Sequence, residues 1–288
     1  MQLPNNTKLQ NGKYKIRETI GRGGFAYTYL AEHCLARQKV AIKELFVHNA
    51  SIRSNQIIGA GNMVVWPTLE FEHNIKESFL REVRTMWRLR QSHIVHIKDV
   101  FEENNTIYYV MEYINGRNLR QILRDEGAIP ENTALKYVKQ VAKGLVYLHL
   151  KRRLHLDIKP ENIIIDAKGY AYIIDLGASV HLKDDGTMTR TSDNTTYTPH
   201  FAPIEMEEHK KPCAASDVYS LGATLYNLLT NRVPEDAKDR VEREDNLTPL
   251  PHSISHPLRD VVMKAMRRNA RHRYPSMSSF LQHLESIN

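Results

Sequence analysis

Short hydrophobic runs separated by polar or glycine-containing turns fill the first third of the chain. Runs of this kind, rich in β-branched and aromatic residues, predict strands. Five are expected, over residues 14–20, 26–30, 39–42, 95–101 and 107–111. One segment has a different period, because Phe79, Leu80, Val83, Met86 and Trp87 recur at the 3.6-residue spacing of a helix. The pattern predicts a β-rich unit that carries one main helix, with Glu82 beside its apolar stripe.

Helical periodicity dominates after Gly116. Apolar positions from Leu135 to Leu148 form one stripe, and further apolar helices are predicted over residues 216–229, 258–266 and 277–287. Between the first two helices, residues 163–165 and 170–174 predict a β-hairpin around the turn 166–169. We therefore predict an α+β fold with a β-rich part over residues 12–114, including an insertion around 47–78, and a mainly helical part over 115–288.

Composition agrees with a folded globular protein. Of 288 residues, 41% are hydrophobic and 25% are charged, and 40 Lys and Arg against 33 Asp and Glu give a net charge of +7. The basic residues are spread along the chain, so we expect no nucleic-acid partner. No apolar run reaches the length of a membrane span, and the first residues lack the basic-then-apolar order of a secretory signal. We therefore expect a cytoplasmic location and no membrane contact within this chain, which leaves open an anchor beyond either end.

The chain has two cysteines, Cys34 and Cys213. Two cysteines cannot build a disulfide framework, and neither has a second cysteine or a histidine at the spacing of zinc ligands. We expect both thiols to be buried and to have no chemical role.

A glycine-rich turn, Gly21-Arg-Gly23-Gly24, joins the first two predicted strands. Glycines lack the Cβ atom that would keep backbone amides away from phosphate oxygens, so such a turn can cover a nucleotide. A dinucleotide-binding turn would be followed by a helix, whereas here a strand follows. Taken alone, the turn is a weak indication of phosphate binding.

Lys43 ends an apolar strand and permits two interpretations. It is either an edge lysine whose ammonium group reaches water along the strand, or a charge on an inner face that needs a partner. Glu82, on the predicted helix 39 residues later, is the candidate partner.

The strongest indication of chemistry is the stretch from His155 to Asn162, together with Asp175. Asp157, Asn162 and Asp175 flank the predicted hairpin. Carboxylate and amide oxygens are ligands for magnesium, and a carboxylate can also receive a hydroxyl proton. An ordered match at this spacing is rarely accidental, so a purely structural role is disfavoured.

The chain resembles a eukaryotic-type protein kinase domain over almost its whole length and is most similar to bacterial serine/threonine kinases. The resemblance rests on the order of the motifs: the glycine turn, Lys43, Glu82, Asp157 with Asn162, and Asp175. The resemblance implies ATP and Mg²⁺, or Mn²⁺, as cofactors. Lys43, paired with Glu82, would hold the phosphates, Asp157 would be the catalytic base, and Asn162 and Asp175 would bind the metal. The implied nucleotide contacts are Ile20, Gly21, Gly23, Gly24, Thr28, Ala41, Lys43, Met111, Glu112, Ile114 and Ile164.

The acceptor class follows from the same resemblance. Lys159 and Thr198 match serine/threonine kinases, in which the lysine neutralises the transferring phosphoryl group, so a protein serine or threonine is the expected substrate. Glu205 and Arg273 resemble a buried ion pair, and Asp217 resembles an acid that anchors the catalytic loop. A pseudokinase scaffold and a small-molecule kinase of related fold are the alternatives, and the sequence does not indicate an oligomeric state.

Leu156 departs from the family pattern, since kinases that need activation-loop phosphorylation carry arginine there. We therefore expect a kinase of the type without that arginine, active in its basal state or switched by another route. Autophosphorylation remains open, because hydroxyl residues crowd the loop at Thr187, Thr189, Thr191, Ser192, Thr195 and Thr196. The smaller departures, Ala26 for a glycine and Leu176 for a phenylalanine, should not abolish activity.

Overall fold

The computed structural model describes residues 1–53, 62–182, 197–240 and 247–287. It divides into two compact units, one formed by residues 1–90 with 95–113 and the other by residues 91–94 with 114–288. The first unit is rich in strands and has one long helix, whereas the second is mainly helical. The predicted α+β fold is confirmed. The six loop hydroxyls from Thr187 to Thr196 lie outside the described residues.

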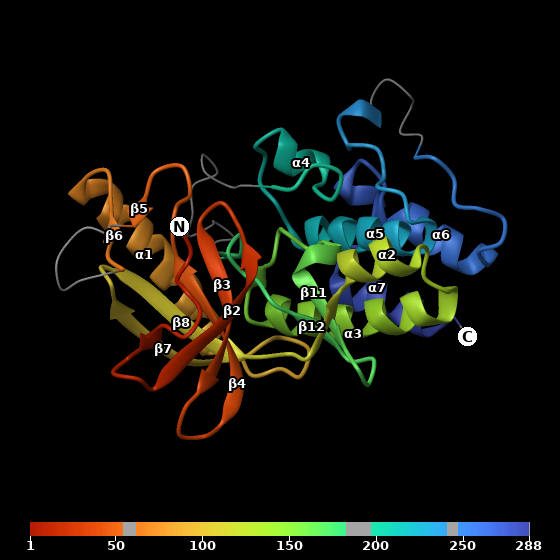
Figure 1. The fold of residues 1–288 in the computed structure, drawn as a ribbon. Coiled ribbons are helices and arrows are strands. Elements are labelled where there is room, and N and C mark those ends of the chain that lie inside the picture. Colours follow the sequence, from red (N-terminus) through yellow and green to blue (C-terminus); the bar gives the residue numbers. More distant parts are fainter. Residues whose placement is uncertain (54–61, 183–196, 241–246, 288) are drawn as a thin grey trace. The chain divides into compact units, whose positions relative to one another are not determined.

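The first unit is built on a six-stranded antiparallel sheet with the order β1-β2-β3-β4-β8-β7 (Figure 1). Its strands are β1 (Lys8–Leu9), β2 (Tyr14–Arg22), β3 (Ala26–His33), β4 (Gln38–Leu45), β7 (Ile97–Glu103) and β8 (Thr106–Glu112). All five predicted strands are present. The two-residue strands β5 (Ile52–Arg53) and β6 (Val64–Val65) form a separate pair within the segment predicted as an insertion.

The helix of the first unit, α1 (Leu69–Trp87), is longer than the apolar stripe indicated. Thr68 caps it by accepting a hydrogen bond from the Phe71 amide at 3.1 Å, and two glutamates in the first turn suit the positive end of the helix dipole. The last part of the segment 47–78 is therefore helical. Phe79, Val83 and Met86 are buried as expected, but Trp87 is 42% exposed, so its assignment to the apolar face was wrong.

In the second unit, helices pack around α5, whose residues from Ala215 to Leu229 are all buried (Figure 1). A Cβ atom on Gly222 would lie 2.8 Å from the Ala265 Cβ, so only glycine lets α5 and α6 approach this closely. The helices are α2 (Leu119–Glu126), α3 (Glu131–Leu150), α4 (Ile204–Glu207), α5 (Ala214–Thr230), α6 (His256–Ala265) and α7 (Met277–Glu285). Short 3₁₀ turns span Pro160–Asn162 and Ala270–His272. The sequence patterns did not predict α2 or α4.

The strands of the second unit carry the candidate catalytic segment. The predicted hairpin is present as β11 (Ile163–Asp166) and β12 (Ala171–Ile173), and β9 (Gly116–Asn118) pairs with β11 on its other side. A Cβ atom on Gly116 would lie 2.0 Å from the Ile165 carbonyl oxygen, so this contact requires glycine. A second pair joins β10 (Arg153–Leu154) to β13 (Val180–His181).

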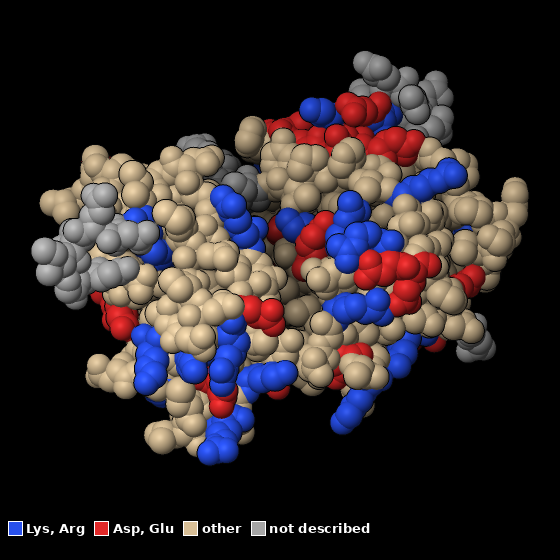
Figure 2. Space-filling view, in the orientation of Figure 1, with Lys and Arg blue, Asp and Glu red and all other residues tan. Residues whose placement is uncertain are grey.

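Two expectations about the surface can be compared with the structure. Cys34 is partly exposed and Cys213 is exposed, so the prediction that both thiols are buried was wrong. Figure 2 shows basic and acidic side chains beside one another on the visible face of each unit, so the net positive charge does not form a surface of one sign there. Within the described ranges, no helix is long and apolar enough to cross a membrane.

Candidate active site

The central strands of the first unit place several predicted nucleotide contacts in one row. Gly21 of β2 pairs with Thr28 of β3, Thr28 pairs with Lys43 of β4, and Lys43 pairs with Tyr109 of β8. Residues directly opposite one another in antiparallel strands project to the same face of a sheet. The row therefore presents the glycine turn, Thr28 and the lysine on one face, which is the face that contacts α1.

Lys43 and Glu82 form the predicted ion pair, with 3.1 Å between the lysine Nζ and the glutamate Oε1. Tyr109 donates its hydroxyl proton to the same Oε1 at 3.0 Å, and its ring centroid lies 5.6 Å from the lysine Nζ. The exposed fractions of the Lys43 and Glu82 side chains are only 14% and 10%. Our sequence reasoning missed Tyr109, although its position two residues before Met111 on the same strand face was a usable signal.

The glycine-rich turn is closed by a hydrogen bond from the Gly23 amide to the Ala26 carbonyl at 2.9 Å. A Cβ atom on Gly24 would meet nothing within 4 Å, and one on Gly23 would have its nearest neighbour at 3.9 Å. Internal packing therefore does not require glycine at either position. The predicted approach of a phosphate to the backbone of this turn would be a reason for glycines there.

The other predicted nucleotide contacts divide between the two units. Ala41 pairs with Met111 across β4 and β8, on the same face as Lys43, and both side chains are buried. Glu112 ends β8, and Ile20 lies in β2 and is 45% exposed. Ile114 and Ile164 belong to the second unit, where Ile164 pairs with Tyr172 in the hairpin. The structure thus places Ala41 and Met111 on the same strand face as Lys43, while the nucleotide-binding roles of all these residues stay a prediction.

In the second unit, Asp157 lies at the centre of a hydrogen-bonded group. Lys159 Nζ is 2.8 Å from Asp157 Oδ2, and the Thr198 hydroxyl donates to Asp157 Oδ1 at 2.6 Å. Lys159 Nζ also donates to the Thr198 hydroxyl oxygen at 2.5 Å. The Asp157 and Lys159 side chains are each about one-fifth exposed, so both can reach solvent or a substrate.

Asn162 and Asp175 supply the atoms expected of magnesium ligands. Asn162 Nδ2 donates to the Asp157 carbonyl and to Asp157 Oδ2, both at 2.9 Å, which leaves the Asn162 amide oxygen to act as a ligand. One oxygen of Asp175 accepts the Gly177 amide at 2.9 Å. Among the described residues, no group of three or more His, Cys, Asp or Glu could hold a metal by itself. Two protein oxygens completed by phosphate oxygens and water fit the usual coordination of Mg²⁺.

A buried histidine and a buried aspartate stand behind the catalytic loop. Burial lowers the pKa of His155, while the carboxylates of Asp217, Asp157 and Asp175 act to raise it. Asp217 accepts the amides of His155 and Leu156 at 2.9 and 2.8 Å and His149 Nε2 at 2.7 Å. Burial acts to raise the pKa of Asp217, but these donors outweigh it and hold that pKa below its usual value. The predicted anchoring contact of Asp217 is present, and His149 is an additional partner that we had not predicted.

Glu205 and Arg273 also form the predicted buried ion pair. Arg273 Nη1 and Nη2 lie 2.7 and 3.0 Å from the two oxygens of Glu205. The remaining donors of the guanidinium bind the carbonyls of Ala215, Arg267 and Arg268, so the buried charge is fully hydrogen-bonded. The pair connects α4 to the residue that follows the 3₁₀ turn Ala270–His272, and the bond to the Ala215 carbonyl connects both to the start of α5.

Comparisons with known proteins agree with this arrangement of residues. Residues 14–284 match the family model described as the protein kinase domain. The chain is 30% identical over 275 residues to the serine/threonine-protein kinase PrkC of Bacillus subtilis, covering 93% of this chain and 39% of PrkC. A probable serine/threonine-protein kinase of Clostridium perfringens is 27% identical over 97% of this chain and 39% of its own length. An Aurora kinase of Patiria pectinifera is 29% identical over 92% of this chain and 61% of its own length.

The chain therefore spans about two-fifths of the length of the bacterial relatives. The family match covers almost every described strand and helix of both units, and it confirms the resemblance inferred from the motifs. This chain belongs to the protein kinase domain family.

Proposed function

We propose that the chain is an active serine/threonine protein kinase, which transfers the γ-phosphoryl group of ATP to a protein hydroxyl. The observation that carries the proposal is a hydrogen-bonded group around Asp157. The side chains of Lys159, Asn162 and Thr198 each donate a hydrogen bond to the Asp157 carboxylate. A pseudokinase has no need of this complete set, and the intact Lys43–Glu82 pair in the first unit also favours activity.

In the proposed reaction, the acceptor hydroxyl oxygen forms a bond to the γ-phosphorus, the bond from that phosphorus to the ADP oxygen breaks, and the hydroxyl proton passes to Asp157. Asn162 orients Asp157 by donating to its carboxylate. Lys43 would bind phosphate oxygens, and Lys159 would offset charge on the transferring group. Magnesium bound by Asn162 and Asp175 would neutralise charge on the nucleotide phosphates.

The acceptor class rests on Lys159 and Thr198. Thr198 both donates to Asp157 and accepts from Lys159, so it holds the lysine next to the base. This arrangement supports a serine or threonine acceptor, which is also the specificity named for the bacterial relatives. The cytoplasmic location expected from the sequence, and the protein nature of the substrate, are parts of the same proposal.

We also propose that the domain is active without a phosphate on the loop that follows Asp175. Leu156 is 3% exposed and belongs to an apolar cluster with Leu154, Val180, Ala202 and Met206. Leu182 and Tyr197, at the two described ends of that loop, pack against the cluster. Apolar packing at Leu156 would thus hold the loop ends where other kinases use an arginine and a phosphate.

The test compares the wild-type protein with Asp157→Asn, using labelled ATP, Mg²⁺ or Mn²⁺, and a generic basic protein. Asp166→Asn is the matched control, because Asp166 lies in the hairpin turn of the same unit and its carboxylate accepts turn amides. We expect Asp157→Asn to lower turnover by about 100- to 10,000-fold and the control to leave it unchanged. ATP binding by a wild-type protein that transfers no phosphate would instead indicate a pseudokinase, and labelling of small molecules alone would indicate a small-molecule kinase.

A further inference from the structure

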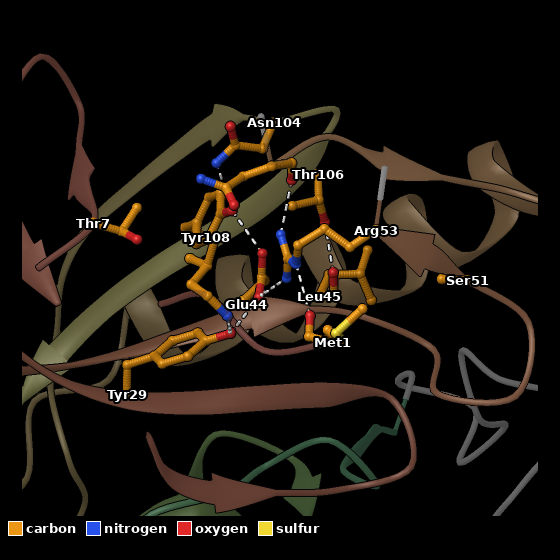
Figure 3. Close-up of polar contacts among 12 residues, drawn as sticks. Met1, Thr7, Tyr29, Glu44, Leu45, Ser51, Arg53, Asn104, Thr106 and Tyr108 are labelled. Atoms are coloured by element: carbon orange, nitrogen blue, oxygen red, sulfur yellow. Dashed lines mark hydrogen bonds and ion pairs between the residues drawn. The ribbon is translucent and has the colours of Figure 1, made fainter. Parts of the chain in front are cut away.

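Glu44 of β4 and Arg53 form a buried ion pair (Figure 3). Glu44 directly follows Lys43, and successive side chains of a strand project to opposite faces. Arg53 Nη2 is 2.6 Å from Glu44 Oε2, and the two side chains are 1% and 0% exposed. Tyr29 donates its hydroxyl proton to Glu44 Oε2 at 2.7 Å, and Tyr108 donates to Oε1 at 2.6 Å. Both oxygens of this carboxylate therefore have partners.

Each of the three guanidinium nitrogens of Arg53 donates a hydrogen bond. Its Nε donates to the Met1 carbonyl oxygen at 2.7 Å and its Nη1 to the Asn62 carbonyl oxygen at 2.8 Å. The same group lies over the Phe46 ring, with 5.3 Å to the ring centroid. A lysine could not make these divergent contacts at once, because they use the planar fork of arginine.

The segment that follows β4 supports the glycine-rich turn. The Phe46 amide donates to the Phe25 carbonyl at 2.9 Å, and the His48 amide donates to the Gly24 carbonyl at 3.1 Å. The rings of Phe46 and His48 both contact the Tyr27 ring, with centroid distances of 5.2 and 4.4 Å. The tip of the turn is thus tied to residues 46–48 by backbone hydrogen bonds and by aromatic contacts.

A tight turn returns the chain from residue 48 to Arg53. Ser51 donates its amide proton to the Val47 carbonyl at 2.7 Å, and its hydroxyl oxygen accepts the Val47 amide at 3.3 Å. This fold brings Arg53 back over Phe46 and into contact with Glu44. Residues 46–51 are therefore held at one end by β4 and at the other by the Arg53–Glu44 pair.

We propose that Arg53 is a positioning residue for nucleotide binding. It holds residues 46–48 against Gly24 and Phe25, and so keeps the glycine-rich turn in the position in which it can cover the phosphates. This inference rests on the proposed function, since the turn must bind ATP. It assigns a role to the segment 47–53, which the sequence indicated only as part of an insertion. Arg53 acts through the backbone and touches no reacting atom.

The decisive variant is the double substitution Glu44→Gln with Arg53→Met. It leaves no unpaired charge in the core, and the side-chain amide that replaces the carboxylate can accept from one tyrosine hydroxyl and donate its NH₂ group to the oxygen of the other. We expect the KM for ATP and the Kd for Mg-ADP to rise about tenfold while kcat changes less than about twofold. Arg53→Lys keeps the charge opposite Glu44 and should give a smaller rise. The matched control is Arg17→Met, which removes an exposed ion pair with Glu32 in the same sheet.

Hydrogen exchange supplies a readout that a general loss of stability would not reproduce. In the double variant, the amides of Phe46 and His48 should exchange faster, whereas the amides of β7 and β8 should keep their protection. Unchanged KM and unchanged exchange at these two amides would overturn the role of Arg53. So would a uniform rise in exchange over the whole first unit, because Arg53 would then be only structural. A wild-type protein that binds no ATP would instead overturn the proposed function itself.

Discussion

Replacing Asp217 by asparagine tests how the catalytic loop is held. The Asp217 side chain is fully buried and accepts three hydrogen bonds, from the amides of His155 and Leu156 and from His149 Nε2. Asparagine has the same shape but offers one acceptor oxygen and one NH₂ group. Whichever way the amide is turned, at least one of these donors then faces another donor.

The magnitude follows from these contacts. A hydrogen bond to a charged acceptor contributes about 1.5–3 kcal/mol, so we expect the variant to lose about 2 kcal/mol of unfolding free energy. Leu156 has a φ angle of +66°, in the left-handed region. That conformation costs a residue with a side chain about 1–2 kcal/mol, so a loop that loses its hydrogen bond to Asp217 should relax. Since Asp157 is the next residue, a displacement of about 1 Å should lower kcat about 100-fold.

The assay combines three measurements on Asp217→Asn: the urea dependence of unfolding, kcat with a basic protein substrate, and exchange of the Leu156 amide. Asp260→Asn is the control, because Asp260 lies in a helix of the same unit with 66% of its side chain exposed. If kcat stays within about twofold and the unfolding free energy within about 0.5 kcal/mol of the wild-type values, the anchoring role of Asp217 is refuted.

Three other predictions concern single contacts. Glu82→Gln removes the negative partner of the β4 lysine and should lower kcat/KM at least tenfold; an unchanged kcat/KM would contradict the role of the pair. Arg273→Met leaves Glu205 buried without its counter-charge and should cost about 3–5 kcal/mol of unfolding free energy, partly restored by adding Glu205→Gln. Burial lowers the pKa of His155, whose Nδ1 accepts the Asp157 amide at 3.2 Å. The neutral imidazole therefore contributes stability above the usual histidine pKa of about 6.5. This contribution should be lost as the pH falls from about 6.5 to below the lower pKa of the folded state. An NMR titration that gave His155 a pKa of about 6.5 or above would refute this reasoning.

The elements with a regular apolar period were predictable from the sequence. The strands of the first sheet are short hydrophobic runs bounded by polar or glycine-containing turns, and the 163–174 hairpin has both its hydrophobic runs and its turn residues. The start of α1 was missed, although Phe71 and Ile75 precede Phe79 at a spacing of four residues, because charged and polar residues surround these two positions. Two-residue strands such as those at 153–154 and 180–181 exist only through pairing with distant residues, and no local pattern encodes that pairing.

The candidate site shows the same division. The motif residues Lys43, Asp157 and Asn162 could be named because the chemistry of phosphate transfer restricts residue type and order. Tyr109, which donates to Glu82, and Arg53, which donates to Glu44, were missed. They act as hydrogen-bond partners across strands and loops, and many residue types satisfy such a role in other proteins. A charged residue on a buried strand face was nevertheless a signal in the case of Glu44, because it requires a partner.

Each unit holds its functional segment with a buried carboxylate that takes no part in the proposed reaction. Glu44 is adjacent to Lys43 and is paired with Arg53, while Asp217 binds the amides just before Asp157. An apolar contact tolerates small shifts of its side chains. The energy of a buried charge with several donors instead rises steeply when the charge moves, because loss of one partner costs several kcal/mol. Buried carboxylates at these two positions therefore restrict the lysine and the base more strictly than hydrophobic packing would.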